Sequence, residues 1–464
     1  MAKEAVTCLL ATVAIVLNDA LGKSQSNGCS APLILPNLPF FVVWNHPTES
    51  CRAKGIDLNL DKWGIIDNTG DKFLGQSISL FYNLGLWPYY SGNETAHNGG
   101  IPQLGNLSEH IRKVQADVES TLPDKTFSGL GVIDFEHWRP LYALNYDSLK
   151  IYQLKSYQLA KLKFPNASKE ELVREATKEF ELAAREFLQN TLSNVTSLRA
   201  SGRWGYYGYP RCWDTYCNTS TVAINDQLYW IYENSTSLYP SIYFSSTDPL
   251  DVRTGRITKV LKETLRLKAT WSPETADVLA YANCQDGPYI MFDTMELDSA
   301  VGLPAEMGLS GAVLWGSSDV MRAKNECTIL QQYIHTTLGP YVLNLTSFFH
   351  ACGSQLCTGH GRCVNKQYES YYQHYLRKTG SKQCQIPQRY LSTIRNTLNS
   401  LQWKTHISRS SELFHQAGES TKYKQPSRKD GSSLRVEPEN NYDNYVCKCF
   451  AGWSGRYCEQ PALL

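Results

Sequence analysis

The sequence lacks a charge excess of either sign. Lysine and arginine together number 45 and aspartate and glutamate 44, so the formal net charge of the 464 residues is +1. Proteins that attract nucleic acid or anionic membranes by charge alone usually carry a strong positive field. The balance therefore gives no electrostatic argument for nucleic acid or for a membrane surface as a partner.

Long apolar runs are also missing, with one exception at the N-terminus. There a single lysine precedes an apolar run from Ala5 to Leu17, and the small residues at 20–22 offer a cleavage site. The run is too short to span a membrane comfortably, so it predicts a signal peptide over residues 1–22. The C-terminal CEQPALL lacks the hydrophobic tail of a lipid-anchor signal. We therefore expect a secreted, monomeric protein without a membrane anchor.

Signatures of metals and cofactors are absent from the sequence as well. No histidine, cysteine or carboxylate cluster has the spacing of metal ligands, and no glycine-rich loop has the pattern that binds phosphate. The ten histidines are scattered singly along the chain. We expect no metal and no cofactor.

Cysteines and glycosylation triplets, by contrast, are frequent. The fourteen cysteines become thirteen when Cys8 leaves with the signal peptide, a number that is typical of an oxidising compartment. Seven Asn-x-Ser/Thr triplets predict a glycoprotein. Their asparagines are Asn93, Asn106, Asn166, Asn194, Asn218, Asn234 and Asn344.

Residues 23–348 alternate short apolar runs with helical patterns. FFVVW (40–44) and GVID (131–134) predict strands, and RWGYYGYP, SLYPSIYF, VLAYAN and SGAVLWGSS are further strand-like pieces. Strands that alternate with helices over some 300 residues indicate an α/β fold with a parallel sheet. The economical version is a TIM-like β/α barrel, here distorted, whose chemistry lies at the C-terminal ends of the strands.

The clearest helix is predicted over residues 167–192. Ser168 and Glu171 have the spacing of a capping box. One apolar face follows with helical periodicity. It consists of Leu172, Ala176, Phe180, Ala183 and Phe187.

The pattern changes near Cys352. CGSQLCTGHGRC and, far downstream, CKCFAGWSGRYC have few apolar residues and closely spaced cysteines, which predicts a small EGF-like module over residues 349–460. A polar insertion at about 366–445, richer in basic than in acidic residues, interrupts this module. Either it is a solvated linker, or it is a patch that holds an anionic polymer.

The stretch GLGVIDFEHWRP ends an apolar run on two carboxylates. Val132 and Ile133 predict a short buried strand, and side chains at i and i+2 of a strand point to the same face. Asp134 and Glu136 would then lie side by side where the strand ends, and one of them would tend to hold a proton near neutral pH. Most D-x-E triplets are merely solvated, but this position favours acid–base chemistry of the glycosidase type.

Several stretches together resemble the hyaluronidases of glycoside hydrolase family 56 in order and spacing. They are FVVWNHPTESC, LFYNLGLWPYY, GLGVIDFEHWRP, RWGYYGYPRC, NDQLYWIYENSTSLYPSIYF, SGAVLWGSS and LGPYVLNLTSFFHACGSQLCTGHGRC. The resemblance covers nearly the whole mature chain apart from 366–445. Phe135 stands where vertebrate members typically have tryptophan, and Gly302-Leu303-Pro304 replaces their Gly-Glu-Ser. Both departures look more like secreted invertebrate members, including venom ones.

The resemblance implies an endo-acting hydrolase that cuts the β-1,4 bonds of hyaluronan after N-acetylglucosamine with retention of configuration. Glu136 would be the general acid and base. Asp134 and Tyr243 would hold and polarise the substrate's own N-acetyl group, whose carbonyl oxygen acts as nucleophile. Tyr82, Tyr207, Asp286 and Trp315 match substrate-groove positions. Arg139 would pair with a catalytic or a substrate carboxylate, or else form a structural salt bridge.

The resemblance also implies a set of disulfides. Cys29, Cys284 and Cys384 remain outside this set, and an odd remainder means at least one free thiol or an intermolecular bond. The implied pairs are Cys51–Cys327, Cys212–Cys217, Cys352–Cys363, Cys357–Cys447 and Cys449–Cys458.

Two other functions are compatible with the same pattern. A hydrolase that prefers chondroitin, and so would bind chondroitin sulfate, needs only small changes in the groove. A catalytically silent protein that binds glycosaminoglycans or mediates adhesion is the other alternative, and the intact set of Asp134, Glu136 and Tyr243 argues against it.

Overall fold

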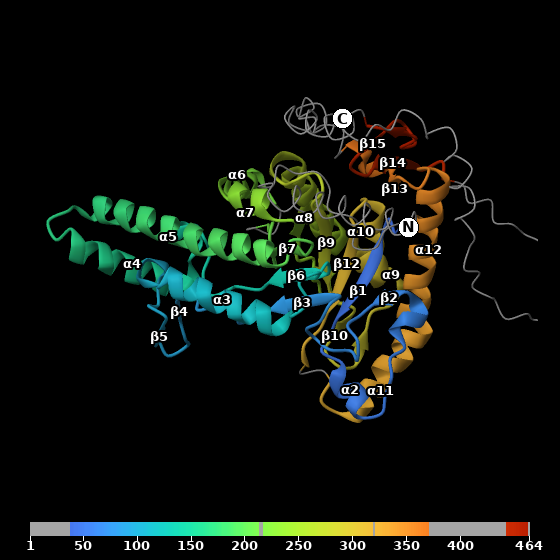
Figure 1. Ribbon diagram of the computed structural model, residues 1–464, viewed down its shortest axis with the longest axis horizontal. Coiled ribbons are helices and arrows are strands. Elements are labelled where there is room, and N and C mark those ends of the chain that lie inside the picture. Colours follow the sequence, from blue (N-terminus) through green and yellow to red (C-terminus); the bar gives the residue numbers. More distant parts are fainter. Residues whose placement is uncertain (1–37, 213–216, 319–320, 371–441, 463–464) are drawn as a thin grey trace, which may run out of the picture. The chain divides into compact units, whose positions relative to one another are not determined.

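The computed structural model describes residues 38–212, 217–318, 321–370 and 442–462 (Figure 1). The expected signal peptide, Cys29, Cys384 and most of the 366–445 insertion lie outside the described residues. Residues 38–370 and 445–461 belong to one compact unit, to which everything below refers. A second unit, Ser381–Asn444 with Ala462–Leu464, lies almost entirely outside the described part.

Two parallel sheets form the centre of this unit. One has the order β3-β6-β7 and the other the order β2-β1-β12-β9-β8. A parallel bridge between Tyr207 and Tyr239 joins them just beyond β7 and β8. The strands are β1 (Phe41–Asn45), β2 (Ile65–Ile66), β3 (Ile78–Phe81), β6 (Leu130–Ile133), β7 (Arg203–Tyr206), β8 (Ser237–Leu238), β9 (Asp277–Ala282) and β12 (Gly311–Trp315).

This strand order confirms the predicted TIM-like barrel and locates its distortion. Among the described residues, no backbone ladder joins β1 or β2 to β3. The side-chain amide of Asn68 makes the contact instead: its Oδ1 accepts from the main-chain N–H of Ile78 (3.1 Å) and its Nδ2 donates to the carbonyl of the same residue (2.8 Å). Among the described residues, the barrel is therefore not closed by strand pairing at this seam, and the Asn68 side chain bridges to β3 there.

The short strand β8 is a second departure from the prediction. SLYPSIYF was expected to be one strand, but only Ser237–Leu238 pair as such. Pro240 has no N–H to donate, so a ladder cannot continue through it. Its carbonyl still accepts from the main-chain N–H of Tyr281 (2.9 Å). Pairing with β9 resumes directly after it, because Ser241 bridges Tyr281 and the main-chain N–H of Ile242 donates to the carbonyl of Tyr281 (2.9 Å). Tyr243 follows at the barrel mouth.

The barrel interior is filled by alternate residues of the strands, as the period of two requires. Tyr207, Tyr243 and Trp315 pack against this core from one end and are only partly buried. The core cluster is Phe41, Val43, Ile78, Leu80, Leu130, Val132, Tyr239, Leu279, Tyr281 and Val313.

Helices surround the strands, and α3, α4 and α5 lie together beside β3, β6 and β7 (Figure 1). The capping box of Ser168 and Glu171 is present, and the helix predicted over 167–192 is confirmed and extends to Leu198. Ala184, not Ala183, is the buried residue, because the apolar face advances by four from Phe180. The helices are α2 (Glu49–Ala53), α3 (Leu107–Thr121), α4 (Lys150–Lys163), α5 (Lys169–Leu198), α6 (Thr219–Gln227), α7 (Tyr229–Asn234), α8 (Leu250–Trp271), α9 (Thr294–Leu297), α10 (Leu303–Glu306), α11 (Lys324–Tyr333) and α12 (Gly339–Gln355).

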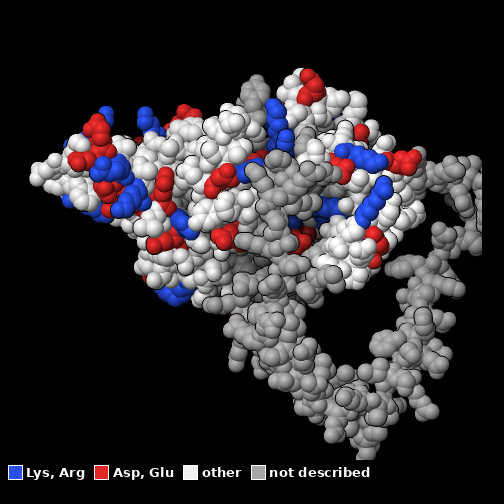
Figure 2. All heavy atoms as spheres, turned by 90° about the horizontal axis from the view of Figure 1, so that it is seen from above, with Lys and Arg blue, Asp and Glu red and all other residues white. Residues whose placement is uncertain are grey.

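Small antiparallel pairs complete the described elements. They are β4 (Tyr89–Tyr90) with β5 (Ala96–His97), β10 (Gln285–Asp286) with β11 (Ile290–Met291), β13 (Gly361–Asn365) with β14 (Tyr445–Cys449), and β15 (Trp453–Ser454) with β16 (Gln460–Pro461). On the face of the molecule shown in Figure 2, basic and acidic side chains are interspersed, as the balanced composition leads one to expect.

Among the described residues five disulfides are present, and they are the pairs that the resemblance implies: Cys51–Cys327, Cys212–Cys217, Cys352–Cys363, Cys357–Cys447 and Cys449–Cys458. Cys284 is a buried thiol, and burial raises its pKa to about 12, so it is a poor nucleophile. The cysteine-rich C-terminal hairpin contacts the barrel through Arg362, whose Nη1 donates to Ser310 Oγ (2.8 Å). That this hairpin is an EGF-like module stays a prediction.

The glycosylation triplets differ in how accessible their amides are. Asn194 and Asn234 are half-buried, and their Nδ2 groups donate to the carbonyls of Asn190 (2.9 Å) and Trp230 (2.7 Å). The other five are exposed: Asn93, Asn106, Asn166, Asn218 and Asn344.

We expect glycans on exposed sites such as Asn93 and none on Asn234, because a glycan there would replace the Nδ2 hydrogen bond and need room that packing denies. Mass spectrometry of peptides from protein secreted by eukaryotic cells, before and after enzymatic deglycosylation, checks this. Glycan on Asn234 at an occupancy equal to that of Asn93 would contradict it.

Candidate active site

The candidate site lies where three neighbouring strands end at one level. Phe81, Ile133 and Tyr206 are register partners across β3, β6 and β7. The next residues, Tyr82, Asp134 and Tyr207, therefore emerge side by side. Two main-chain hydrogen bonds extend the ladder to them, from Asp134 N to Phe81 O (3.0 Å) and from Tyr207 N to Ile133 O (2.9 Å). This is the C-terminal end of the barrel, where the chemistry of such folds is located.

A pocket of about 210 Å³ opens at this end. It brings together six of the residues that the sequence singled out, and it adds Tyr281, which the sequence did not suggest because it belongs to the apolar strand VLAYAN. The lining residues are Leu80, Tyr82, Asp134, Glu136, Tyr207, Tyr243, Tyr281 and Trp315.

The two carboxylates of the pocket differ in environment. Burial raises the pKa of Asp134 to about 7, and the nearby charge of Glu136 adds to this, while Arg211 and Arg139 oppose it. The Glu136 side chain is 51% exposed, and its Oε1 accepts from Nη2 of Arg211 (3.2 Å). Asp134 is therefore the carboxyl of the pair whose pKa is raised, whereas the resemblance requires the transferable proton on Glu136 during bond cleavage.

Phe135 fixes the direction of this pair. Its ring is buried, stacks on Trp87 (centroids 4.2 Å apart) and meets Trp138 edge-on (4.6 Å). Because alternate side chains of an extended segment point to opposite sides, the anchoring of Phe135 turns both carboxylates towards the pocket.

Aromatic rings and hydroxyls form the rest of the wall. Trp315 Nε1 donates to Tyr82 Oη (2.9 Å), and the ring of Tyr82 stacks on Phe73 (5.7 Å). Tyr207 Oη donates to Ser241 Oγ (3.3 Å). Burial raises the pKa of Tyr82 to about 12 and that of Tyr243 well above its usual value, so both keep their protons as donors. Flat rings with hydroxyl donors suit the faces and polar rims of sugar rings.

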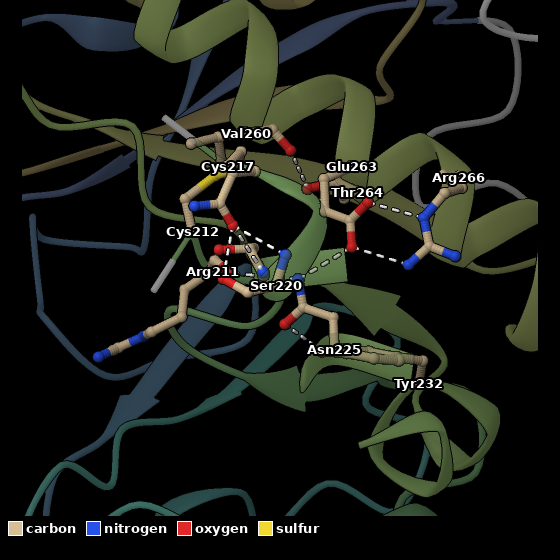
Figure 3. The surroundings of a disulfide bond; sticks show 12 residues. Arg211, Cys212, Cys217, Ser220, Asn225, Tyr232, Val260, Glu263, Thr264 and Arg266 are labelled. Carbon is tan, nitrogen blue, oxygen red and sulfur yellow. Dashed lines mark hydrogen bonds and ion pairs between the residues drawn. A yellow bond between two sulfur atoms is a disulfide. The ribbon is translucent and has the colours of Figure 1, made fainter. Parts of the chain in front are cut away.

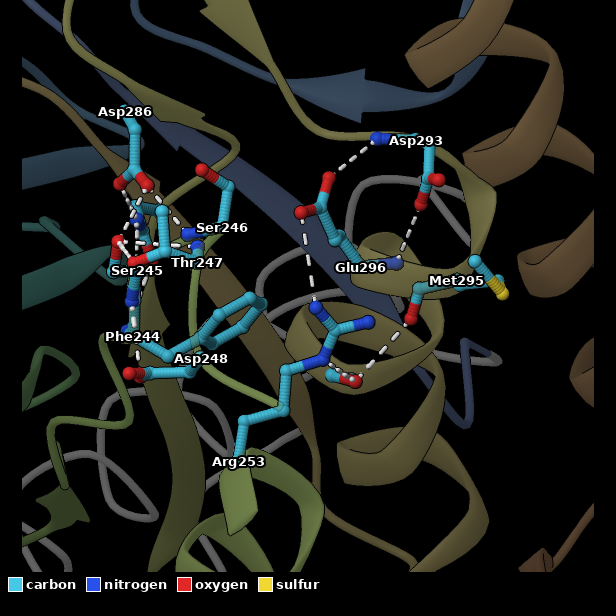
Figure 4. Close-up of polar contacts among 12 residues, drawn as sticks. Phe244, Ser245, Ser246, Thr247, Asp248, Arg253, Asp286, Asp293, Met295 and Glu296 are labelled. Carbon is cyan, nitrogen blue, oxygen red and sulfur yellow. Dashed lines mark hydrogen bonds and ion pairs between the residues drawn. The ribbon is translucent and has the colours of Figure 1, made fainter. Parts of the chain in front are cut away.

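The main chain of Tyr243 is held by a residue of α8, outside the pocket. Arg256 Nη2 donates to the main-chain carbonyl of Tyr243 (3.0 Å) and to Asp248 Oδ2 (3.1 Å). Asp286, expected in the groove, lies outside the pocket lining. Its Oδ2 accepts from Ser245 Oγ (3.0 Å) and from the main-chain N–H of Ser246 (Figure 4). Asp286 therefore anchors the loop that follows Tyr243, and its place in the substrate groove stays a prediction.

Arg139 also lies outside the pocket lining. Its Nη1 donates to the main-chain carbonyl of Glu136 (3.0 Å), and its main-chain N–H donates to Asn145 Oδ1 (2.8 Å). The ion pair with Glu136 is formed by Arg211, which the sequence gave no reason to single out. That Arg139 binds a substrate carboxylate stays a prediction. Arg211 becomes adjacent to Glu136 only through the pairing of β6 with β7.

The described residues lack a metal-ligand cluster and a membrane-spanning helix. Within them, no three histidine, cysteine or carboxylate side chains gather as metal ligands would. None of their helices combines the length and apolar character needed to cross a membrane.

Comparison with known proteins places this geometry in a family. The profile of the glycoside hydrolase family 56, described as hyaluronidase, matches residues 29–415. Hyaluronidase conohyal-P1 of Conus purpurascens is 38% identical over 348 residues, which cover 75% of each chain. Hyaluronidase-3 of Sus scrofa is 38% identical over 370 residues, covering 76% of this chain and 88% of that protein. The sequence identity to the Conus purpurascens relative therefore equals that to the Sus scrofa relative, and it does not favour an invertebrate over a vertebrate type.

A solved structure agrees with these sequence relatives. Bee venom hyaluronidase in complex with a hyaluronic acid tetramer superposes with a TM-score of 0.63 at 31% identity, covering 66% of this chain and 99% of that one. Sequence and fold thus agree, and the chain belongs to the hyaluronidases of glycoside hydrolase family 56.

Proposed function

We propose that this chain is a secreted endo-β-N-acetylglucosaminidase that hydrolyses the β-1,4 bonds of hyaluronan. The observation that carries the proposal is the pocket in which Asp134 and Glu136 meet Tyr243 at the C-terminal end of the barrel. A related structure with this fold has been solved with a hyaluronic acid tetramer, which supports hyaluronan as the polymer.

In this proposal the N-acetyl group of the substrate occupies the pocket. Its carbonyl oxygen attacks the anomeric carbon, and Tyr243 and Asp134 hold the group from either side. Asp134 accepts from the acetamido N–H and, once ionised, stabilises the positive charge that develops on the group. No carboxylate of the protein acts as nucleophile, which departs from the usual scheme of two carboxylates.

Glu136 is the proposed general acid and then base. It lies at the exposed rim, where the leaving oxygen and later a water molecule have access. The pair holds one proton near neutral pH, and the productive state has it on Glu136 while Asp134 is ionised. Glu136 donates this proton to the leaving oxygen and then removes one from the attacking water, so the pair returns to its first state.

The test is an assay of reducing ends released from hyaluronan and from chondroitin across a range of pH, with proton NMR of the first product. We expect faster cleavage of hyaluronan and a β-configured new reducing end. Faster cleavage of chondroitin would favour the chondroitin-preferring alternative. Retention of polymer without cleavage would favour the non-catalytic one. An α-anomer formed first, or a sugar ester on Asp134 found by mass spectrometry, would overturn the mechanism.

A further inference from the structure

Arg211 places a positive charge directly beside the proposed acid. Its Nη2 lies 3.2 Å from Glu136 Oε1, and its side chain is 24% exposed, so solvent still reaches it. An ion pair this exposed contributes little to stability.

The guanidinium group is held in place by its own loop. Arg211 Nε donates to the carbonyl of Gly208 (3.3 Å), and the guanidinium lies over the ring of Tyr209 (5.7 Å). Gly208 has a φ of +74°, and a Cβ there would come within 2.8 Å of Arg211 Nη2. Glycine thus gives the guanidinium the room to lie across the loop.

The main chain of Arg211 is fixed from the other side by a buried polar network (Figure 3). Asn225 Nδ2 donates to the carbonyl of Arg211 (3.2 Å) and to Glu263 Oε1 (3.0 Å). Glu263 is buried and is paired with Arg266 (2.7 Å). The disulfide of Cys212 follows immediately, and the Arg211 side chain extends away from this network in Figure 3.

The chemistry of hyaluronan brings a carboxylate to the same place. A general acid must come within hydrogen-bonding distance of the leaving oxygen. In hyaluronan this oxygen is attached to C4 of a glucuronate, and the carboxylate of that sugar is attached to the neighbouring C5. A uronate carboxylate therefore lies close to Glu136 whenever the bond is in position for cleavage. The planar guanidinium group binds carboxylates through paired hydrogen bonds.

We propose that Arg211 binds the carboxylate of the glucuronate on the leaving side of the scissile bond and releases Glu136 as it does so. The proposal rests on the proposed hyaluronan hydrolysis. In the ligand-free protein the guanidinium pairs with Glu136, and in the complex it pairs with the uronate. Glu136 then takes over the one proton that it shares with Asp134 and gives it to the leaving oxygen, which departs as the C4 hydroxyl. Binding of the glucuronate carboxylate by Arg211 thereby frees Glu136 to carry the proton for the leaving oxygen.

The test compares Arg211→Gln and Arg211→Lys on two oligosaccharides of equal length: hyaluronan, and hyaluronan whose uronate carboxyls have been reduced to alcohols. Loss of a charged hydrogen-bonding partner lowers kcat/KM on hyaluronan by about 10- to 100-fold in Arg211→Gln. On the reduced oligosaccharide the same variant loses less than about threefold. Arg211→Lys recovers part of the loss. Arg112→Gln, which breaks an exposed pair with Glu109 on α3, is the matched control and leaves both rates unchanged.

If Arg211→Gln lowered kcat/KM equally on the two oligosaccharides, the proposal would be overturned, because the contribution of Arg211 would then not depend on the uronate carboxylate. An unchanged rate on both would overturn it as well. If the reduced oligosaccharide is cleaved too slowly to follow, its inhibition constant against hyaluronan cleavage gives the same comparison. Failure of the unaltered protein to cleave hyaluronan would instead refute the proposed function, so the two failures are distinguishable.

Discussion

Replacing Glu136 by glutamine is expected to lower the rate of hyaluronan cleavage by about 10²–10⁴-fold, the range that general acid–base assistance typically supplies. Glutamine keeps the shape of the side chain but cannot transfer a proton to the leaving oxygen. Polymer binding should persist, because the aromatic wall of the pocket is untouched. The measurements are kcat on hyaluronan and, separately, the dissociation constant of a hyaluronan oligosaccharide.

A matched control for this variant is Glu233→Gln, at an exposed position of α7, a helix that contributes no residue to the pocket lining. It should leave both constants unchanged. Thermal unfolding of the two variants shows whether the fold is intact. Full activity of a well-folded Glu136→Gln would remove Glu136 from the role of acid and would require another donor at the pocket rim.

Replacing Asp134 by asparagine is expected to lower activity by orders of magnitude and yet to stabilise the fold at alkaline pH. The amide cannot stabilise the positive charge that develops on the acetamido group, so cleavage fails. The effect on stability follows from the pKa of Asp134, which burial and Glu136 raise from 3.8 to about 7. A carboxyl that is more basic in the folded state favours folding at low pH, and this contribution is lost as pH rises from about 4 through 7.

Each pH unit between the two pKa values is worth about 1.4 kcal/mol, so above pH 7 the ionised side chain costs the fold at most on the order of 4 kcal/mol. Asparagine does not ionise and avoids this cost. Urea unfolding at pH 4 and pH 8 checks the prediction: the variant should gain on the unaltered protein only at pH 8. The exposed carboxylate of Asp251, replaced by asparagine, should show no such gain. Equal differences at the two pH values would mean that Asp134 ionises freely in the folded protein.

Local patterns of the sequence accounted for those parts of the fold that depend on neighbours in the chain. The alternation in GVIDFE put Asp134 and Glu136 on one side of a strand end, and the capping box fixed the start of α5. Features that depend on pairing between strands were not visible. The approach of Arg211 to Glu136 needs the β6–β7 ladder, and the burial that keeps a proton on Asp134 needs the whole barrel mouth.

Other errors have equally local causes. Pro240 interrupted a predicted strand because it removes one donor of the ladder, which resumes at Ser241. The periodicity of α5 selected Ala184 over its neighbour because a helix of this length accumulates small differences in angle. The role of Asp286 in the ligand-free structure became clear only from its loop partners, Ser245 and Ser246. The resemblance to the family indicated which residues line the groove, and the structure shows how their side chains are oriented.

The Cys51–Cys327 disulfide has a consequence for how the protein withstands damage. It joins α2, which follows β1, to α11, which follows β12, and these two strands are themselves paired. The 276-residue span between the two cysteines is therefore a covalent ring that includes β3, β6 and β7. A single protease cut within this ring, for instance in the exposed turn around Phe164 between α4 and α5, opens the ring without separating the two pieces. A nicked molecule keeps its halves together, and with them the carboxylate pair and the aromatic wall, for as long as that bond stays oxidised.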